Sequence, residues 1–200
     1  MDSAASETDV VAYLPDTVQD AVKVLITGPF AVGKTTMVHT LSEITPLHTE
    51  EALSEAGQHV DDLTGVPDKS TTTVAIDFGR LTLSDTLVLY LFGTPGQPRF
   101  DGLWQGLARG AMGAIVLVDT RRLEHSFPLL DRVEDLDLPY TVAANTFDGA
   151  PRHDLDELRL ALDLRPGTPL VECDVRDRQS AANAVIALVE HLLSPQPEYP

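Results

Sequence analysis

The sequence has few of the residues that build disulfide frameworks, zinc sites or membrane spans. Only one of its 200 residues is a cysteine, Cys173, which excludes an internal disulfide and a cysteine-rich zinc site. The six histidines show no metal-ligand spacing. No apolar run reaches about 18 residues, so no segment predicts a membrane-spanning helix.

Basic residues are also scarce. There are 14 Lys and Arg against 31 Asp and Glu, a net charge of −17, which disfavours nucleic acid and anionic lipid as direct partners. The N-terminus has no apolar signal core, and neither end carries a lipidation motif. We therefore expect a cytoplasmic protein with no direct membrane anchor, which reaches a membrane only through a partner.

One of the three lysines stands in the most informative segment, GPFAVGKTT at residues 28–36. A Gly, four residues and then Gly-Lys-Thr is the phosphate-binding loop pattern, in which the glycines let backbone N–H groups point at an anion. Lys34 would reach the β- and γ-phosphates, and the Thr35 hydroxyl would be a ligand of Mg²⁺. The segment predicts nucleotide contacts from Gly28, Phe30, Ala31, Val32, Gly33, Lys34, Thr35 and Thr36.

Strand and helix patterns alternate along the chain. Apolar or alternating runs predict strands at 22–27, 73–83, 87–92, 114–119, 140–145 and 169–174. Helical patterns lie at 35–44, 98–109, 126–135, 154–162 and 178–193, with a short helix expected at 49–56 inside the long polar stretch 45–72. The prediction is an α/β P-loop NTPase fold, a six-stranded mostly parallel sheet with one antiparallel hairpin and helices on both faces. It forms one domain at 21–193, between flexible segments at 1–20 and 194–200.

Further stretches fall in register with the phosphate loop and make residues 22–193 resemble the Ras-like small GTPases. The first is Thr-Val-Ala-Ile-Asp-Phe, which begins at Thr73. The resemblance implies that Thr73 closes on Mg²⁺ and the γ-phosphate in the GTP state. A threonine chosen only for its strand propensity, or Thr72 as the matching residue, remains the alternative.

The second stretch is Phe-Gly-Thr-Pro-Gly-Gln at residues 92–97, where the family reads Asp-x-x-Gly-Gln. The resemblance implies that the Gly96 N–H bonds the γ-phosphate and that Gln97 orients the attacking water. The family's aspartate, which helps to hold Mg²⁺, is replaced by Gly93. This departure, shared with MglA-type bacterial GTPases, leaves open how the metal is held.

The third and fourth stretches follow the last two strands. Asn-Thr-Phe-Asp matches the family's Asn-Lys-x-Asp, which implies that Asn145 tethers neighbouring loops and that Asp148 accepts two N–H bonds from guanine. Asp174 and Val175 are candidates for a backbone N–H that reads the guanine oxygen. A plain Asn/Asp turn and a buried apolar Cys173 are the alternatives.

The whole pattern is most similar to MglA-like and actinobacterial conservon ATP/GTP-binding proteins. That resemblance implies a GTP/GDP switch with Mg²⁺, in which Lys34, Thr73 and Gln97 are catalytic and Thr35 and Thr73 are metal ligands. It also implies protein partners of the roadblock/LC7 type and a sensor-kinase-like protein. The bulky Phe30 and the lack of any arginine in 35–79 favour slow hydrolysis. A non-hydrolysing nucleotide-bound scaffold and a P-loop ATPase that uses Asp119 remain alternatives.

Overall fold

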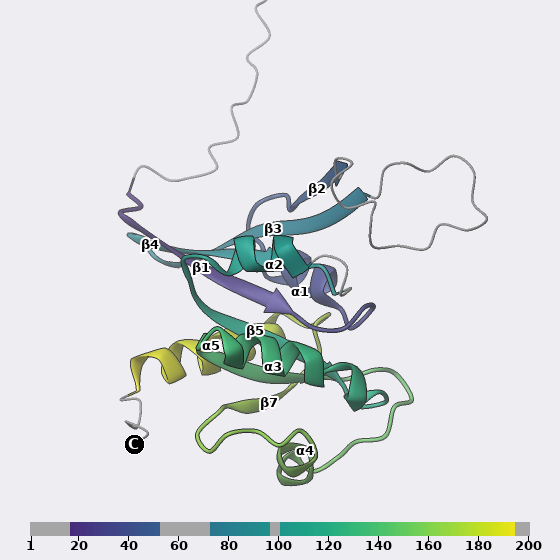
Figure 1. Ribbon diagram of the computed structural model, residues 1–200. Coiled ribbons are helices and arrows are strands. Elements are labelled where there is room, and N and C mark those ends of the chain that lie inside the picture. The colour runs from purple at the N-terminus through teal and green to yellow at the C-terminus, as the bar shows by residue number, and fades with distance from the viewer. Residues whose placement is uncertain (1–16, 53–72, 97–100, 195–200) are drawn as a thin grey trace, which may run out of the picture.

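A computed structural model describes residues 17–52, 73–96 and 101–194 (Figure 1). Its centre is a seven-stranded sheet with the order β2-β3-β4-β1-β5-β6-β7. The strands are β1 (Asp20–Thr27), β2 (Leu47–Ala52), β3 (Thr73–Ser84), β4 (Leu87–Gly93), β5 (Ala111–Asp119), β6 (Tyr140–Asn145) and β7 (Leu170–Cys173).

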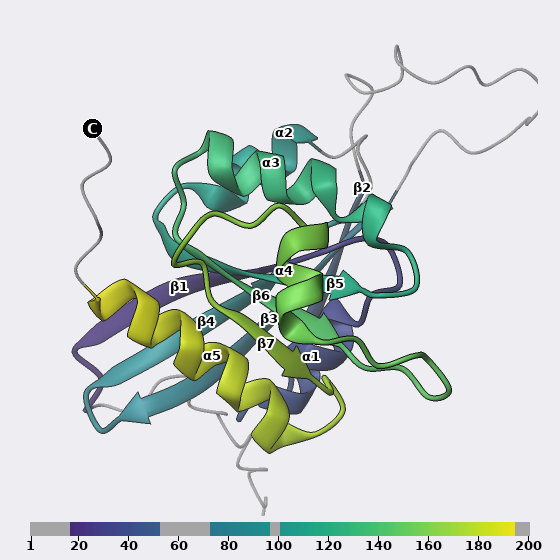
Figure 2. The ribbon, with the colours of Figure 1, turned by 90° about the horizontal axis from the view of Figure 1, so that it is seen from below.

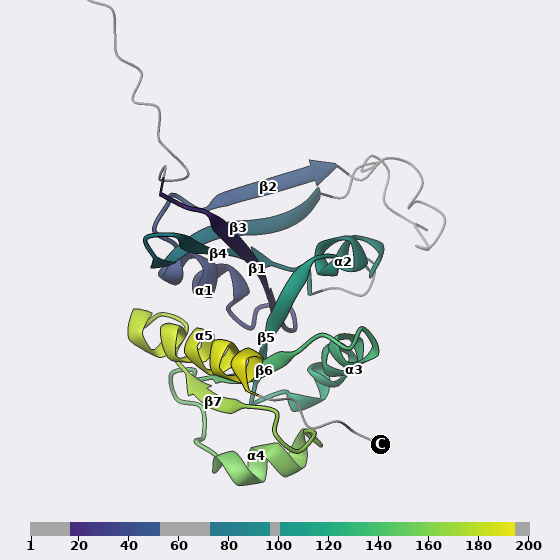
Figure 3. The same cartoon turned by 90° about the vertical axis from the view of Figure 1, so that its left-hand side faces the viewer.

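Helices cover both faces of this sheet (Figure 3). Side chains alternate along β1, so that Val24 and Ile26 pack in one core and Leu25 in the other. The first core takes α1 (Lys34–Leu41) and α5 (Arg178–Leu193). The second takes α2 (Asp101–Ala108), α3 (Phe127–Asp135) and α4 (Leu155–Ala161), and a 3₁₀ turn, η3 (Leu123–His125), precedes α3.

The predicted fold class is confirmed, with one strand more than expected. β3 and β4 form the predicted antiparallel hairpin, and β4, β1, β5, β6 and β7 are parallel. The short helix expected at 49–56 was wrong: β2 occupies Leu47–Ala52 and pairs antiparallel with β3, from Leu47↔Phe78 to Ala52↔Thr73. The outer edge of β3 offers unpaired N–H and C=O groups, and this long-range pairing overrides local helix propensity.

The first helix is also shorter than the pattern at 35–44 predicted. α1 ends at Leu41 because Ser42 has an extended backbone with ψ 137°. The next amide, that of Glu43, donates to the Arg80 carbonyl of β3 at 2.8 Å. The chain therefore leaves the helix early to run along the sheet.

The longest helix of the described ranges is α5, with 16 residues. Ala181, Ala184, Val185 and Leu188 are buried on it, and the helix packs on β5, β6 and β7 (Figure 2). No helix within residues 17–52, 73–96 and 101–194 is long and apolar enough to cross a membrane. The loops that follow β1, β4, β5, β6 and β7 all leave the carboxyl edge of the sheet, where ligands of open α/β sheets bind.

Candidate functional site

The loop between β1 and α1 excludes side chains at both of its glycines. Gly28 has φ 151°, and a Cβ there would lie 2.6 Å from the Leu117 carbonyl oxygen of β5. Gly33 has φ 107°, and a Cβ there would lie 2.9 Å from Cγ2 of Val175. The loop therefore needs glycine both for its backbone angles and for its close contact with β5 and with the loop after β7.

The end of the same loop, where α1 begins, is not capped by a side chain of the protein. Ala31 has φ 62°, a left-handed conformation that non-glycine residues rarely adopt and that often marks a functional loop. The N-terminus of α1 has no side-chain cap and no acidic residue in its first turn. An anion placed there would meet both the helix dipole and the first amides of α1.

Lys34 folds back over this loop. Its Nζ donates to the carbonyl oxygens of Gly28 at 2.8 Å and Pro29 at 2.7 Å. Burial lowers the pKa of Lys34 to about 8, although the nearby Asp77 carboxylate acts in the opposite direction. The ammonium group is thus held at the point where a phosphate would enter the loop.

The segment after β4 lies directly on the phosphate loop. A Cβ on Gly96 would lie 2.7 Å from the Gly28 carbonyl oxygen and 2.8 Å from the Lys34 Nζ. The Thr94 amide donates to the Ile26 carbonyl at 2.9 Å and continues the β1–β4 pairing past the strand ends. The structure therefore brings Gly96 close to Lys34, and both residues are predicted to contact phosphate.

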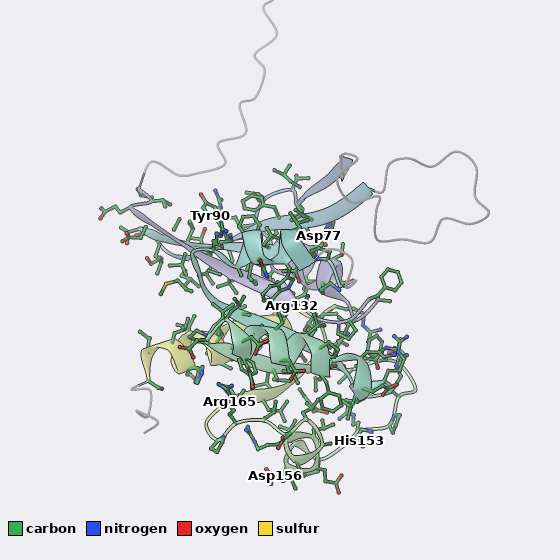
Figure 4. All side chains as sticks on the ribbon, viewed as in Figure 1. Asp77, Tyr90, Arg132, His153, Asp156 and Arg165 are labelled. Carbon is green, nitrogen blue, oxygen red and sulfur yellow. The ribbon has the colours of Figure 1, made fainter. Side chains whose placement is uncertain are left out.

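The next residue of the loop has a partner that the sequence analysis missed. The Thr35 hydroxyl donates to Oδ2 of Asp77 at 2.5 Å. Asp77 projects from β3 (Figure 4) and is only 5% exposed. A carboxylate therefore stands beside the hydroxyl predicted to bind Mg²⁺. The signal in the sequence was an acidic residue inside an otherwise β-branched and apolar strand.

Asn145 joins the phosphate loop to the loop after β7. Its Nδ2 donates to the Val32 carbonyl at 2.8 Å, and its Oδ1 accepts from the Val175 amide at 3.2 Å. The side chain comes from the end of β6 and is buried. It therefore fixes the two loops relative to each other, which is the tethering geometry predicted for this residue.

The residue predicted to read the base, Asp148, is held by an arginine. Both of its carboxylate oxygens accept from the guanidinium of Arg176, at 2.9 and 3.0 Å. Arg176 also bonds both oxygens of Asp174. The side chain of Asp148 is 87% exposed, and Arg176 lowers the pKa of this carboxyl. Asp148 is therefore charged and reachable, but it is paired.

A cavity of about 300 Å³ lies beside Asp148 and includes Thr146, Phe147 and Asp174 in its lining. The guanidinium of Arg121 stacks on the Phe147 ring at 3.7 Å from its centroid. Arg121 also makes a bidentate pair with the buried Asp119, at 2.8 Å on each side. Arg122 adds a further bond to Asp119 at 3.2 Å, so this carboxylate is already engaged.

The remaining residues predicted to contact the nucleotide differ in their exposure. Phe30 is 69% exposed, Ala31 and Thr36 are exposed, and Val32 is fully buried. The two amides expected to read the guanine oxygen are used internally: that of Asp174 donates to Ser180 and that of Val175 to Asn145. Gln97 lies outside the described residues, and only the backbone of Thr73, at the start of β3, is described.

A family model describes the same stretch of chain. The model of a conserved hypothetical ATP binding protein matches residues 26–195. The chain belongs to this family. An uncharacterized protein of Methanocaldococcus jannaschii is 30% identical over 132 residues, which are 65% of this chain and 73% of that protein.

Solved structures of GTPase domains share the fold. The G domain of the T. maritima FeoB iron transporter has a TM-score of 0.61 at 22% identity, over 86% of this chain and 99% of that one. The FeoB G-domain from Methanococcus jannaschii has a TM-score of 0.59 at 14% identity, over 88% and 100%. At these identities the likeness establishes a P-loop GTPase-like fold for this member of the ATP binding protein family.

Proposed function

We propose that this protein is a guanine-nucleotide switch that binds GTP or GDP with Mg²⁺ and hydrolyses GTP slowly. The observation that carries this proposal is the double hydrogen bond of Asn145 to Val32 and Val175. It links the phosphate loop to the loops that surround Asp148, so one frame holds an anion site and a base-reading carboxylate. Such a frame can select a complete nucleotide.

Asp148 favours guanine over the adenine that the family description names. The N1–H and 2-amino groups of guanine are two adjacent donors, which match the two oxygens of one carboxylate. Adenine offers one donor beside an acceptor, which would face a carboxylate oxygen. Because unpaired or repelled polar groups are costly when desolvated, this difference would discriminate strongly between the two bases.

The described residues fit a magnesium–nucleotide complex. Mg²⁺ prefers oxygen ligands and is usually held by one or two protein groups together with phosphates and waters. The Thr35 hydroxyl and the Asp77 carboxylate supply such oxygens next to Lys34. Bound Mg²⁺ would neutralise phosphate charge and orient the β- and γ-phosphates, while Thr35 holds the metal and Lys34 holds the phosphates.

Slow hydrolysis follows from what surrounds the phosphate loop. The exposed ring of Phe30 stands on that loop, where it would crowd an incoming arginine. Arg121 and Arg122 bond Asp119, and Arg176 bonds Asp148. An arginine finger is worth about 10³–10⁵ in rate, so we propose that a protein partner supplies it while Gln97 orients the water and Thr73 senses the γ-phosphate.

The resemblance to MglA-like and conservon proteins supports a signalling role for this switch. We propose partners of the roadblock/LC7 type and a sensor-kinase-like protein, through which the protein would reach a membrane. A nucleotide-bound scaffold would share the binding geometry but release no phosphate. Single-turnover phosphate release from GTP, with and without partner, separates the switch from the scaffold.

Base selection is tested with Asp148→Asn. We expect the variant to lose about 10- to 100-fold in GDP affinity, because the amide accepts only one of the two hydrogen bonds and carries no charge. Affinity for xanthosine diphosphate should rise, since an amide can donate to the additional oxygen of xanthine. Competition of unlabelled guanosine, xanthosine and adenosine nucleotides against a fluorescent GDP analogue measures the affinity for each of the three nucleotides.

Asp156→Asn is the matched control, because Asp156 is exposed on the neighbouring α4 (Figure 4). It should leave all three affinities unchanged. If the parent protein prefers ATP or ADP and Asp148→Asn does not change the order of preference, the guanine assignment is wrong. The ATP binding described for the family would then apply to this chain.

A further inference from the structure

Asp77 and Gly93 face each other across the antiparallel pair β3–β4. They are paired residues in the register of the two strands, so their side-chain positions lie on the same face of the sheet. A Cβ added to Gly93 would lie 3.1 Å from both Cβ and Oδ2 of Asp77. The Asp77 carboxylate therefore fills the space into which a side chain at position 93 would project.

The backbone angles at position 93 do not explain why this residue is a glycine. It ends β4 in strand conformation and does not have the positive φ seen at Gly28 and Gly33. Any residue can adopt such a backbone, so the conformation does not require glycine here. The close contact with Asp77 favours glycine, because a Cβ at 3.1 Å would require the Asp77 side chain to shift by a few tenths of an ångström.

A β-bulge in the hairpin produces this pairing. The register shifts between Thr82 and Ser84, where Ser84 pairs with Leu87 and Thr82 with Val88. Without the shift, Asp77 would stand opposite Thr94 rather than Gly93. A one-residue slip moves a side chain to the other face of the sheet, so the bulge sets which residue of β4 the carboxylate meets.

The carboxylate also touches the group predicted to hold the metal. Asp77 is nearly buried and accepts from the Thr35 hydroxyl at 2.5 Å. Buried carboxylates are stabilised by nearby cations or by metals, and the charge of Asp77 already acts on the Lys34 ammonium. Its position at the phosphate loop, beside a threonine hydroxyl, provides two hard oxygens of the kind that Mg²⁺ takes.

We propose that Asp77 holds the Mg²⁺ of the nucleotide and thereby replaces, from β3, the acid that Gly93 lacks at the end of β4. This inference rests on the proposed nucleotide binding at the same site. The two residues are complementary: Gly93 on β4 has no side chain and so leaves room for the carboxylate of Asp77 on β3. The metal site is therefore retained although its motif residue is absent.

The test compares GDP dissociation with Mg²⁺ and with a chelator, using a fluorescent GDP analogue. In the parent protein, removal of Mg²⁺ should speed dissociation about 5- to 150-fold, the usual range of coupling between two ligands. Asp77→Asn keeps the shape of the side chain but removes its charge. We expect its ratio of dissociation rates, with chelator against with Mg²⁺, to fall close to one, whatever its affinity in chelator.

Asp85→Asn is the control, because Asp85 lies exposed in the turn of the same hairpin; its ratio should equal that of the parent. The exchange variant, Asp77→Gly with Gly93→Asp, moves the carboxylate to the other strand and removes the close contact. We expect it to recover the magnesium ratio. A merely structural role for Asp77 would not be restored by this exchange.

Each result decides between the alternatives. If Asp77→Asn retains the full magnesium ratio, or if the parent binds GDP equally well with and without Mg²⁺, the assignment of Asp77 is overturned. If the parent binds neither GDP nor GTP under any condition, the proposed nucleotide function fails instead. Should Asp77→Asn unfold, as thermal unfolding would reveal, the exchange variant decides: recovery of the magnesium ratio supports the inference, and a folded protein without magnesium dependence overturns the proposed exchange of roles between positions 77 and 93.

Discussion

The phosphate end and the base end of the site are built in different ways. The proposed phosphate end consists of backbone groups and partly buried hydrogen bonds: Lys34 is held by two carbonyls, and Thr35 is bonded to the buried Asp77. At the base end, the carboxylate of Asp148 is 87% exposed and is paired with Arg176, which is 51% exposed. One end is fixed by the fold, and the other by ion pairs in contact with solvent.

This difference implies different costs of binding. The backbone of the phosphate loop is already held by its contacts with β5 and with the loop after β7, so a phosphate would require little rearrangement beyond a rotation of the Lys34 side chain. At the proposed base end, guanine would meet Asp148 only after Arg176 releases both carboxylate oxygens. Exposed ion pairs contribute only about 0–1 kcal/mol, so release of Arg176 should cost little binding free energy. We therefore expect contacts at the phosphate end to contribute most of the nucleotide affinity.

Lys34→Ala should have the largest effect on binding. Removal of the ammonium deletes charge-assisted hydrogen bonds worth about 1.5–3 kcal/mol each, so GDP affinity should fall at least about 100-fold. Titration calorimetry with GDP measures the loss. The control is Lys23→Ala, since Lys23 lies on β1, which leads into the phosphate loop, but its Nζ donates to the Arg109 carbonyl away from that loop. Equal affinities of both variants would contradict a dominant phosphate end.

The phosphate end was also the part of the site most readable from the sequence. The loop pattern fixes the spacing of Gly28, Gly33 and Lys34 within one short segment, because the loop is a local structure. Likewise, unbroken apolar runs gave β5 and β6, and α5 matches its predicted range of 178–193. Local periodicity is sufficient where the buried positions of an element follow its own strand or helix repeat.

Features that depend on pairing between distant residues could not be predicted in this way. The strand β2 forms because β3 offers it an edge, which no property of residues 47–52 reveals. Asp77 was missed because its partner position depends on a bulge that shifts the hairpin register by one residue. Arg176 was missed because its contact with Asp148 joins two loops that are 28 residues apart.

Asp119→Asn tests whether the base end contains a catalytic acid or a structural one. Arg121 and Arg122 lower the pKa of Asp119 to about 2 from its usual 3.8. Because this pKa is depressed in the folded protein, the pair stabilises it above about pH 4, and the contribution is lost as the pH falls from 3.8 towards 2. We expect the variant to be about 2 kcal/mol less stable at pH 7.

Urea unfolding at pH 7 and at pH 3 measures this effect, and the difference between variant and parent should shrink at the lower pH. Asp131→Asn, on the exposed face of α3, should not change stability at either pH. GDP binding should keep its magnesium dependence in Asp119→Asn. Loss of that dependence with unchanged stability would instead support an ATPase-type acid at the end of β5.

Arg176→Ala should give the smallest change, and its direction is informative. If Arg176 only competes with guanine for Asp148, its removal should raise GDP affinity about two- to five-fold, as expected for an exposed ion pair. Arg165→Ala is a close control: Arg165 is 53% exposed and pairs with Glu134 at 3.0 Å, away from the site (Figure 4). It should leave affinity unchanged. A several-fold loss of affinity in Arg176→Ala would mean that the guanidinium turns onto the base after releasing Asp148, and would make the base end a binding element in its own right.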